Sequence, residues 1–422
     1  MRLQKILSRL QRLHPKEIDL SLNRIKNLCK KLGNPQDKIN CIQVCGTNGK
    51  GSTISFLRSI LREANYKCNI YTSPHVKIIN ERYIYNDEMI SDNNLADLLT
   101  EIEEVNNGQP LTYFEALTAA FFLGCKEYSD NLVIAEFGLF GRGDAVNILK
   151  KNICNIVTSC SEDHLDWLPK NERTIERIIY EKTSALLDTN IVIAKQSSNE
   201  IIRFIKNNIS KNKAKKYFFN EDYNFVLKEN DFFYYEDKYG GLKIPKPKMN
   251  GQFQLENAST AIAALRVLEN IKITDQNIFD GIKKANNIAR LEEIKSGKLK
   301  NLVKDNMLLI DSSHNPGGSK VLNDYLQTLD CKIHVIIGMM ANKDHEKYIS
   351  YFKDISSLTT IDIPNQPNSI SGKDLREKFK NIPNVKYQTN IEEAIKSVNL
   401  DSGDVLLITG SLYLAGEVLS LN

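Results

Sequence analysis

The stretch "CIQVCGTNGKGST", residues 41–53, decides the fold. An apolar run enters a glycine-rich loop, and the loop leads into "STISFLRSILREA" (52–64), whose apolar residues recur at helical spacing. The next run, "CNIYTS" (68–73), has the composition of a second strand. A strand, a loop, a helix and a strand in this order require a right-handed crossover, so the stretch predicts a parallel sheet.

The same alternation continues along the chain. Strand-like runs follow at 131–137, 152–159 and 191–194, with helical patterns between them. These runs are apolar throughout, as expected for strands that helices cover on both faces. Residues 196–249 are rich in lysine and asparagine, and the aromatic alternation in "FFYYEDKYGG" (232–241) predicts a hairpin.

A second α/β domain is predicted after residue 289. Four strand-like runs, at 306–313, 332–339, 357–364 and 404–411, alternate there with helical segments. The chain of 422 residues also exceeds what one hydrophobic core usually serves. We therefore expect an α/β protein with a P-loop-type parallel sheet in residues 1–289 and a smaller, Rossmann-like α/β domain in residues 290–422.

The composition narrows the class of protein. A hydrophobic fraction of 41% with 26% charged residues is typical of a soluble globular protein. The net charge of +4 arises from 56 basic and 52 acidic residues spread along the chain, so no nucleic-acid surface is predicted. The eight cysteines include no C-x-x-C pair and lie mostly in apolar runs. This pattern favours reduced, buried thiols and a cytoplasmic location over disulfides or a zinc site.

No membrane span is predicted, because no apolar run approaches the roughly 18 residues that a span requires. The N-terminal "MRLQKILSRLQRLHP" (1–15) is rich in arginine and lacks acidic residues. A transit peptide has such a composition. A short amphipathic helix packed on the body explains it as well, and we expect that helix.

The glycine loop has the chemistry of a phosphate site, although its spacing is not G-x-x-x-x-G-K-[ST]. Gly46, Gly49 and Gly51 let the backbone approach a ligand, and the following helix offers its positive N-terminus. Lys50 can neutralise phosphate oxygens, and Ser52 is placed to bind magnesium. The alternative is a tight turn with an exposed lysine. We favour the phosphate site because three glycines, a lysine and a serine occur in one turn.

Two further residues follow predicted strands, at the edge where parallel sheets bind ligands. Glu136 ends a buried strand in "VIAEFGLFGRGDAVN" (133–147), where a carboxylate is costly unless Arg142 or a cation satisfies it. His164 follows an apolar strand in "IVTSCSEDHLDW" (156–167). A lone histidine is more often structural than a ligand. Together with the phosphate loop and Glu136, it points to a metal role.

Ten segments resemble, in this order, the motif series of folylpolyglutamate synthase and dihydrofolate synthase, enzymes of the Mur ligase superfamily. They are "VCGTNGKGST" (44–53), "TSPH" (72–75), "EFGLFGRGDAVN" (136–147), "TSCSEDHLDWL" (158–168), "EKTSALL" (181–187), "QLENASTAIAALR" (254–266), "ARLE" (289–292), "DSSHNPGG" (311–318), "GMMANKD" (338–344) and "TGSLYLAGE" (409–417). The segment "LHPKEIDLSLNRIKNLCKKLGNPQ" (13–36) resembles the N-terminus of the bacterial bifunctional form, which makes dihydrofolate and then extends its glutamate tail.

The resemblance implies an ATP site in an N-terminal ATPase domain and a site for two Mg²⁺ ions. The ATP site would comprise Asn48, Gly49, Lys50, Gly51, Ser52, Asn257, Arg290, Asp311 and His314, so residues of both domains would contact the nucleotide. The metal ligands would be Ser52, Ser73, Glu136 and His164. The implied catalytic residues are Lys50, Glu136, His164 and Lys182. Lys182 matches a lysine that the family carries carbamylated, whereas its sequence context predicts a surface lysine on a helix.

Three segments match those that line the pterin site in the bifunctional enzymes. They comprise Asp19, Leu20 and Ser21; Thr112, Tyr113, Phe114 and Glu115; and Gly143, Asp144 and Ala145. The chain departs from the family pattern beside the last segment, because Phe140 stands where glycine is usual and Gly143 where leucine is usual.

The resemblance implies a ligase that uses ATP to join L-glutamate to dihydropteroate and to reduced folates, and that acts as a monomer. A monofunctional folylpolyglutamate synthase is the nearest alternative. A small-molecule kinase would share the loop but would not need a second α/β domain, and a scaffold without turnover would be expected to lose Lys50, Glu136 or His164, all of which are present. A muramyl-peptide ligase usually carries an additional N-terminal domain, whereas this chain opens within about 40 residues of its loop.

Overall fold

The structure is a computed structural model that describes residues 2–14, 16, 19–228, 231–380, 382 and 384–422. It divides into two compact units. Unit 1 comprises Met1–Cys160, Glu172–Pro247 and Leu255–Ala285, and unit 2 comprises Ser161–Asn171, Lys248–Gln254 and Asn286–Asn422. Two short segments therefore pack with the C-terminal unit although they come earlier in the chain. The expected domain boundary after residue 289 stays a prediction.

Unit 1 is built on an eight-stranded sheet in the order β4-β3-β2-β5-β1-β6-β7-β8. Its strands are β1 Asn40–Cys45, β2 Cys68–Tyr71, β3 Tyr83–Tyr85, β4 Glu88–Met89, β5 Leu132–Glu136, β6 Cys154–Val157, β7 Ile191–Ile193 and β8 Lys216–Phe218. The six strands from β2 to β8 in this order pair in parallel, which confirms the predicted sheet. The antiparallel edge of β3 and β4 was not predicted.

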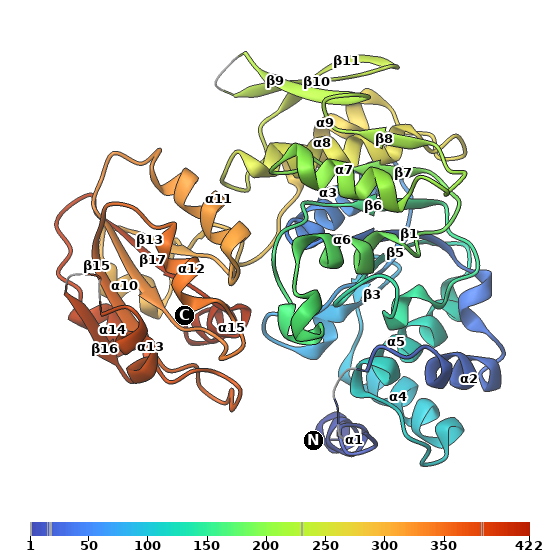
Figure 1. Cartoon of the computed structure of the whole chain (residues 1–422), viewed down its shortest axis with the longest axis horizontal. Coiled ribbons are helices and arrows are strands. Elements are labelled where there is room, and N and C mark those ends of the chain that lie inside the picture. The colour runs from blue at the N-terminus through green and yellow to red at the C-terminus, as the bar shows by residue number, and fades with distance from the viewer. Residues whose placement is uncertain (1, 15, 17–18, 229–230, 381, 383) are drawn as a thin grey trace. The chain divides into compact units, whose positions relative to one another are not determined.

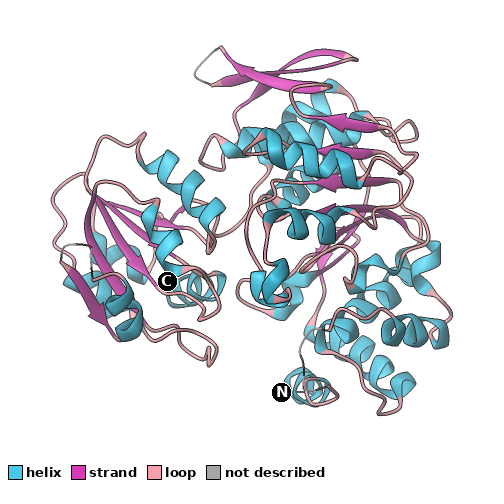
Figure 2. Ribbon diagram, in the orientation of Figure 1, coloured by secondary structure: helices cyan, strands magenta, loops and turns pink. Residues whose placement is uncertain are grey.

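Helices cover both faces of this sheet, as the apolar strands require. They are α1 Arg2–Leu10, α2 Asn23–Lys31, α3 Lys50–Glu63, α4 Asp92–Asn106, α5 Tyr113–Gly124, α6 Ile175–Thr183, α7 Asn199–Asn208, α8 Phe253–Arg266 and α9 Asp275–Lys284. Figures 1 and 2 show α6 and α7 on one side of the strands and α3, α8 and α9 on the other. Short 3₁₀ helices lie at η1 Pro35–Lys38, η2 Ile79–Arg82, η3 Cys125–Tyr128 and η4 Ala145–Ile148.

Local chemistry explains where these helices begin. The side chains of Ser91, Thr112, Thr174 and Ser198 each accept a hydrogen bond from a backbone N–H of the first turn. The helix α1 buries its apolar residues at i, i+3, i+4 and i+7 and packs against α4, so the expected N-terminal amphipathic helix is confirmed. Of the segments predicted at this end of the chain, residues 1, 15, 17 and 18 lie outside the described residues.

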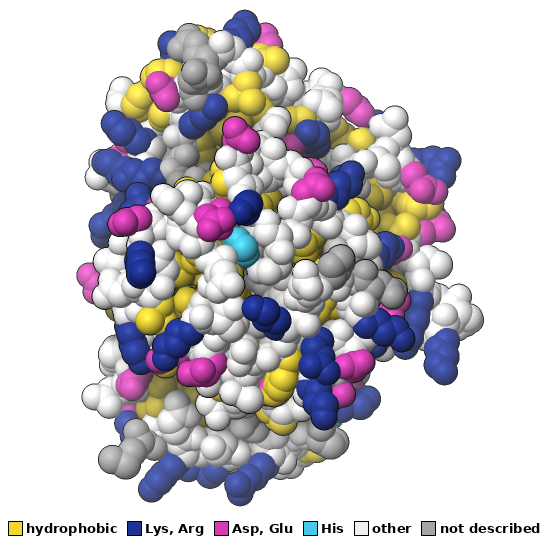
Figure 3. Space-filling view, turned by 90° about the vertical axis from the view of Figure 1, so that its left-hand side faces the viewer, with side chains coloured by type: hydrophobic (Ala, Val, Ile, Leu, Met, Phe, Trp, Pro, Cys, Tyr) yellow, Lys and Arg dark blue, Asp and Glu magenta, His cyan; other side chains and the backbone are white. Residues whose placement is uncertain are grey.

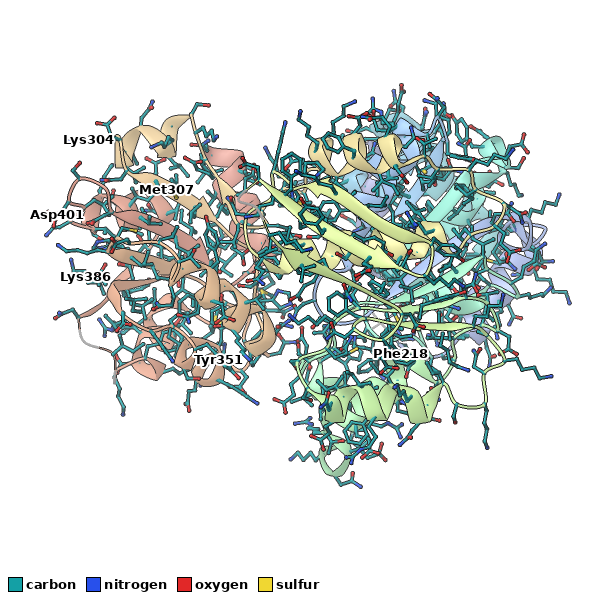
Figure 4. All side chains as sticks on the ribbon, turned by 90° about the horizontal axis from the view of Figure 1, so that it is seen from above. Phe218, Lys304, Met307, Tyr351, Lys386 and Asp401 are labelled. Carbon is teal, nitrogen blue, oxygen red and sulfur yellow. The ribbon has the colours of Figure 1, made fainter. Side chains whose placement is uncertain are left out.

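A small antiparallel sheet, ordered β11-β10-β9, follows β8. Its strands are β9 Tyr223–Leu227, β10 Phe232–Asp237 and β11 Gly240–Pro245, so the predicted hairpin is confirmed and gains a third strand. Phe233 and Tyr235 are buried, and the alternate residues Phe232 and Tyr234 lie on the outer face. Figure 4 looks onto these strands, with Phe218 at the end of β8 labelled.

Unit 2 is a second α/β structure with a six-stranded sheet in the order β12-β13-β17-β14-β15-β16. Its strands are β12 Glu292–Glu293, β13 Met307–Ile310, β14 Ile333–Ile337, β15 Ile355–Ile361, β16 Val385–Gln388 and β17 Val405–Thr409. Its helices are α10 Lys298–Val303, α11 Pro316–Leu326, α12 His345–Ser350, α13 Gly372–Lys378, α14 Ile391–Ser397 and α15 Leu412–Leu421, with η5 Leu165–Trp167 and η6 Lys170–Glu172 in the earlier segment. The four predicted strands are confirmed.

Of the remaining strands of unit 2, β16 was not predicted, and β12 lies in residues 289–300, which the sequence left open as a connection or a first strand. The strand β16 carries Lys386 on an exposed position and lacks an apolar run, and β12 spans only Glu292–Glu293. Figure 4 labels Met307 of β13 and Lys386 of β16 within this sheet. Except for β12, the strands pair in parallel.

A polar link joins the starts of three strands of unit 2. The ring of His334, on β14, lies 2.8 Å from Ser357 Oγ through Nδ1 and 3.0 Å from Asp404 Oδ2 through Nε2. His334 and Asp404 are both buried. Because a buried carboxylate needs a partner, this link holds β14, β15 and the residue before β17 together.

All eight cysteines lie in the described part of the chain and are free thiols, seven of them buried. Burial raises the pKa of Cys45 to about 12 and that of Cys160 to about 11, so both stay protonated. The prediction of reduced, buried thiols is therefore confirmed, with the partly exposed Cys331 as the exception.

On the face drawn in Figure 3, basic and acidic side chains are both spread among uncharged ones. Within the described residues, no helix is long and apolar enough to cross a membrane.

Candidate active site

The glycine loop joins β1 to α3 in a fixed conformation. Gly46 has a φ of 135° and Gly49 a φ of 88°, values that favour glycine. The backbone N–H groups of Thr47 and Asn48 both donate to the carbonyl oxygen of Ser159, which follows β6, at 2.8 and 3.1 Å. Gly49 is the N-cap of α3, so the loop ends at the positive end of a helix of 14 residues.

Both glycines are also required by close neighbours. A Cβ on Gly46 would lie 2.0 Å from the hydroxyl oxygen of Thr158, and a Cβ on Gly49 would lie 2.5 Å from Asn257 Oδ1. Asn257 belongs to α8 and was predicted to bind ATP. The structure therefore places one predicted nucleotide residue directly against the predicted phosphate loop.

Lys50 opens α3 and folds back over the loop. Its Nζ donates to the carbonyl oxygens of Gly46 and Thr47 at 3.3 and 3.1 Å, and lies 3.8 Å from Glu136 Oε1. The side chain is only 14% exposed, which excludes the alternative of a turn with an exposed lysine. An ammonium held over a glycine loop at a helix N-terminus is suited to bind phosphate oxygens.

Glu136 lies at the end of β5 beside Ser73. Its Oε2 accepts a hydrogen bond of 3.1 Å from the backbone N–H of Ser73. Arg142, the partner considered from the sequence, instead donates two hydrogen bonds to Glu181, so that interpretation of Arg142 was wrong. The Oγ of Ser73 is buried and has no hydrogen-bond partner among the described residues. A carboxylate beside an unsatisfied hydroxyl is an arrangement that fits a hard cation.

Lys182 lies in the last turn of α6, where the sequence context predicted a surface lysine. That interpretation is wrong, because the side chain is 2% exposed. Its Nζ donates to the carbonyl oxygens of Gly46 and Leu139 at 2.9 and 3.0 Å and lies 5.7 Å from the ring centre of Phe140. The carbonyl oxygen of Gly46, the first residue of the glycine loop, therefore accepts hydrogen bonds from two lysines, Lys50 and the buried Lys182.

The other predicted metal ligands lie in two places. Ser52 is buried in the first turn of α3. His164 belongs to the segment Ser161–Asn171 of unit 2 and has a φ of 60°, which is unusual for a residue other than glycine. No group of three or more His, Cys, Asp or Glu side chains is arranged to hold a metal ion in the described ranges. The predicted set of metal ligands differs from such a group, because two of its four members are serines.

Unit 2 contains a polar cluster around Asp163. The Oδ1 of Asp163 accepts from Lys343 Nζ at 2.7 Å and from the His164 backbone N–H at 2.9 Å, and Oδ2 accepts from Asn315 Nδ2 at 3.0 Å. The ring of His314 lies 3.4 Å away. Burial alone would raise the pKa of Asp163, but His164, His314 and Lys343 outweigh it and hold this pKa well below the usual range. These residues line a cavity of about 70 Å³.

Three predicted nucleotide residues meet beside this cluster, at the end of β13. Asp311 is buried and accepts hydrogen bonds from the backbone N–H groups of Leu291 and Ser313. Arg290 donates to Ser312 Oγ at 2.6 Å, and His314 Nδ1 lies 3.0 Å from the carbonyl oxygen of Ser312. The structure thus brings Arg290, Asp311 and His314 together within unit 2.

The three segments predicted to line the pterin site, called the acceptor segments below, converge in unit 1. A Cβ on Gly143 would lie 2.9 Å from Leu20 Cβ, so the first and third segments are in contact. Arg24 joins the first to the second, because it bonds both Asp19 and Glu115. These contacts bring together the predicted residues Asp19, Leu20, Ser21, Thr112, Tyr113, Phe114, Glu115, Gly143, Asp144 and Ala145.

The acceptor segments also reach the residues around Ser73. A Cβ on Gly138 would meet the Phe114 ring at 2.7 Å and Ser73 Oγ at 3.2 Å. Asp144 fixes this turn, since its Oδ2 accepts from the backbone N–H groups of Gly138 and Leu139. Burial raises the pKa of Asp144 to about 6, although backbone donors and Lys182 lower it.

Sequence reasoning missed several residues of these clusters. Arg24 was not singled out, and Thr158 was quoted only within a motif. Asp163 was considered, with Glu162 and Asp166, only as a neighbour that could orient the imidazole of His164. No local signal marks Arg24, because its partners Asp19 and Glu115 are 5 and 91 residues away.

Two family models match the chain. The Mur ligase middle domain matches residues 44–265, and the glutamate ligase domain of the Mur ligases matches residues 290–412. The chain is 29% identical over 420 residues to the dihydrofolate synthase/folylpolyglutamate synthase of Bacillus subtilis, covering 94% of each. It is 28% identical to the protein of the same name from Escherichia coli, covering 98% of this chain and 94% of the other.

A solved structure has the same fold. The structure of E. coli FolC in complex with DHPP and ADP superposes with a TM-score of 0.87 at 27% identity, covering 99% of this chain and 97% of that one. The middle-domain model spans the glycine loop, Glu136 and Lys182, and the glutamate ligase model spans Arg290 and Asp311. The chain therefore belongs to the Mur ligase family.

Proposed function

We propose that this chain is an ATP-dependent ligase that joins L-glutamate to dihydropteroate, forming dihydrofolate, and to the γ-carboxylate of reduced folates. The full-length similarity to proteins named dihydrofolate synthase/folylpolyglutamate synthase supports this activity. The similarity to a FolC structure that holds DHPP and ADP supports the two substrate classes.

One observation carries the proposal. Lys50 lies over a glycine loop at a helix N-terminus, 3.8 Å from Glu136, and Glu136 is bonded to Ser73, whose hydroxyl is unsatisfied. The loop suits a triphosphate, and the carboxylate with the hydroxyl suits its counter-cation. The acceptor segments contact the same place through Gly138.

The proposed reaction has two steps. An oxygen of the acceptor carboxylate attacks the γ-phosphorus of ATP, so a C–O–P bond forms, the bond to the bridging oxygen breaks, and ADP leaves. The glutamate amine then attacks the acyl carbon, loses a proton, and displaces inorganic phosphate to leave an amide. Lys50 and the N-terminus of α3 stabilise the charge on the phosphoryl oxygens, so these groups act by positioning and electrostatics.

Ser73 and Glu136 fit a magnesium ion, and we propose Ser52 as a ligand of a second ion beside the nucleotide. Bound Mg²⁺ would neutralise phosphate charge as carboxylate and triphosphate approach. His164 of unit 2 remains a predicted ligand. The roles of Asn48, Gly49, Gly51, Asn257, Arg290, Asp311 and His314 in nucleotide binding are part of the same proposal.

Lys182 is proposed to be carbamylated in the active enzyme. Its Nζ donates to two carbonyl oxygens, a geometry suited to the unmodified ammonium. Addition of CO₂ to the neutral amine forms an N–C bond and releases a proton, and the anion would then give up these two acceptors. Native mass spectrometry of the intact protein in bicarbonate buffer should show the added mass of CO₂ on the wild type and not on Lys182→Met, and an unmodified wild-type mass would remove this part of the proposal.

The test of the function is acceptor-dependent release of ADP by the purified protein. We expect release only when L-glutamate and either dihydropteroate or a reduced folate are both present. Comparing the two acceptors separates a bifunctional enzyme from a monofunctional folylpolyglutamate synthase. Release with a muramyl-peptide acceptor instead would contradict the folate assignment. We further propose a monomer that works in the cytoplasm, which sedimentation and cell fractionation would test.

A further inference from the structure

Arg24 connects two of the segments proposed to bind the acceptor. It lies at the start of α2, where Nη2 donates to Asp19 Oδ1 at 2.9 Å and Nε donates to Glu115 Oε2 at 2.9 Å. Its side chain is 23% exposed, whereas that of Glu115 is 3% exposed. One guanidinium therefore holds the loop at Asp19 and the start of α5 at a fixed separation.

Glu115 also forms hydrogen bonds that stabilise the start of α5. Its Oε2 accepts from the Thr112 backbone N–H at 2.8 Å, and its own N–H donates to Thr112 Oγ1 at 3.2 Å, which forms a capping box. The other oxygen, Oε1, is buried and has no hydrogen-bond partner among the described residues. The contact with Arg24 thus falls on the oxygen that also caps the helix.

The loop at Asp19 is fixed on its other side as well. Leu20 lies against Gly143, where a Cβ would approach Leu20 Cβ to 2.9 Å and the Leu20 carbonyl oxygen to 3.1 Å. This loop therefore lies between Arg24 and the third acceptor segment. Its position depends on the bond between Arg24 and Asp19.

Two other arginines of unit 1, Arg9 and Arg142, pair differently. Arg9 donates Nε and Nη2 to the two oxygens of Glu103 at 2.7 and 2.6 Å, and Arg142 forms the same fork with Glu181. A fork satisfies both carboxylate oxygens and is the arrangement that binds most strongly. Arg24 instead divides its donors between two carboxylates and leaves Glu115 Oε1 unsatisfied. Arg177 is likewise shared between Glu172 and Glu181, so what distinguishes Arg24 is that its two partners belong to two different acceptor segments.

We propose that Arg24 is a positioning residue of the acceptor site: it sets the separation between the loop at Asp19–Ser21 and the N-terminus of α5, and thereby the affinity for the acceptor. This inference rests on the proposed function. The acceptor it serves is the bicyclic pterin part of dihydropteroate, and Arg24 acts through Asp19 and Glu115 rather than in the chemical step.

The test compares Arg24→Met with Arg9→Met in steady-state kinetics. We expect Arg24→Met to raise KM for dihydropteroate at least about tenfold, to leave kcat within about threefold, and to leave KM for ATP unchanged. Arg9→Met removes an exposed interhelical pair of the same unit, so none of these constants should change. Arg24→Lys keeps the charge but replaces the planar guanidinium with one amine, so its KM for dihydropteroate should lie between those of the wild type and Arg24→Met.

A second measurement addresses folding. If Arg24→Met acted only by loosening unit 1, kcat and KM for ATP would change together with KM for dihydropteroate, and thermal unfolding would shift. Asp19→Asn should raise KM for dihydropteroate, and the double variant should show less than the product of the two single effects, because both substitutions break one link.

The outcomes separate this inference from the function on which it rests. Wild-type protein that releases no ADP with any folate acceptor contradicts the proposed function. Active wild-type protein whose Arg24→Met variant keeps its KM for dihydropteroate, or raises KM for ATP equally, contradicts the role of Arg24 alone.

Discussion

Lys182 and Gly46, 136 residues apart in the chain, are joined by a hydrogen bond of 2.9 Å from Nζ to the carbonyl oxygen. The same ammonium bonds Leu139, so α6 connects the glycine loop with the turn after β5. Because the amine is buried, these two bonds replace the water that a lysine normally keeps.

Replacing Lys182 with methionine should therefore damage both stability and turnover. Two carbonyl oxygens would lose a charged donor, at a cost on the order of 3 kcal/mol in the free energy of unfolding. Chemical denaturation and the ADP-release assay measure the two effects. An equally stable variant with full turnover would show that the contact is dispensable.

Lys50→Ala should abolish turnover without unfolding the protein. The ammonium is placed over the loop where phosphoryl charge develops, and removing one such group costs roughly 100- to 1000-fold in rate. Circular dichroism should remain that of the wild type. The exposed Lys211→Ala provides the matched control and should retain full activity. Turnover by Lys50→Ala would remove the loop from the mechanism.

Ser73→Ala and Glu136→Gln should change the requirement for magnesium. Ser73 Oγ is a buried hydroxyl beside the Glu136 carboxylate, and the proposed ion takes both as ligands. The Mg²⁺ concentration for half-maximal turnover should rise on the order of 10- to 100-fold, while saturating Mg²⁺ should recover part of the rate for Ser73→Ala. An unchanged titration curve for both variants would place the ion elsewhere.

Asp144 should make unfolding depend on pH. Its pKa is about 6 in the folded protein and lower in the unfolded chain, so the folded state binds the proton more tightly. Its contribution is fully present below the unfolded pKa and is lost as the pH rises through 6. From pH 8 to pH 5, the free energy of unfolding of the wild type should therefore gain on the order of 1 kcal/mol relative to Asp144→Asn. Parallel curves for the two proteins would contradict this.

His334→Phe should destabilise unit 2. The buried Asp404 would lose the ring at 3.0 Å and keep the Asp401 backbone N–H at 2.8 Å, and we expect the lost contact to cost about 2 kcal/mol. The neighbouring exposed pair of Lys332 and Asp401 supplies the control, because Lys332→Ala should leave the unfolding midpoint unchanged. An equal response of the two variants would show that burial does not matter here.

Much of the fold follows from the sequence. The apolar runs and the crossover at residues 41–73 predict a parallel sheet that contains β1, and the four runs from residue 306 onward predict the core of unit 2. What escaped were β16, whose edge position needs no apolar run, and the edge strands β3 and β4, which are short and antiparallel. Periodicity is read over several residues, so two short strands such as β3 and β4 show no clear pattern, even though Tyr83 and Tyr85 of β3 are buried.

The candidate site, too, was predicted only in part from the sequence. The loop and Glu136 were predicted from local chemistry, because strand ends of a parallel sheet collect ligands. The burial of Lys182 and the bridging by Arg24 were not, since each depends on partners far away in the chain. Helical context says which residues share a face, but it does not say which face the rest of the protein covers.

The two backbone N–H groups of Thr47 and Asn48 donate to the carbonyl oxygen of Ser159. These bonds within the protein restrict the backbone of the loop, which reduces the backbone entropy that phosphate binding would have to remove there. Since Ser159 is the second residue after β6, the geometry of the loop depends on a strand that need not touch the nucleotide. A change in the length of that strand end would alter the loop as surely as a change in its glycines.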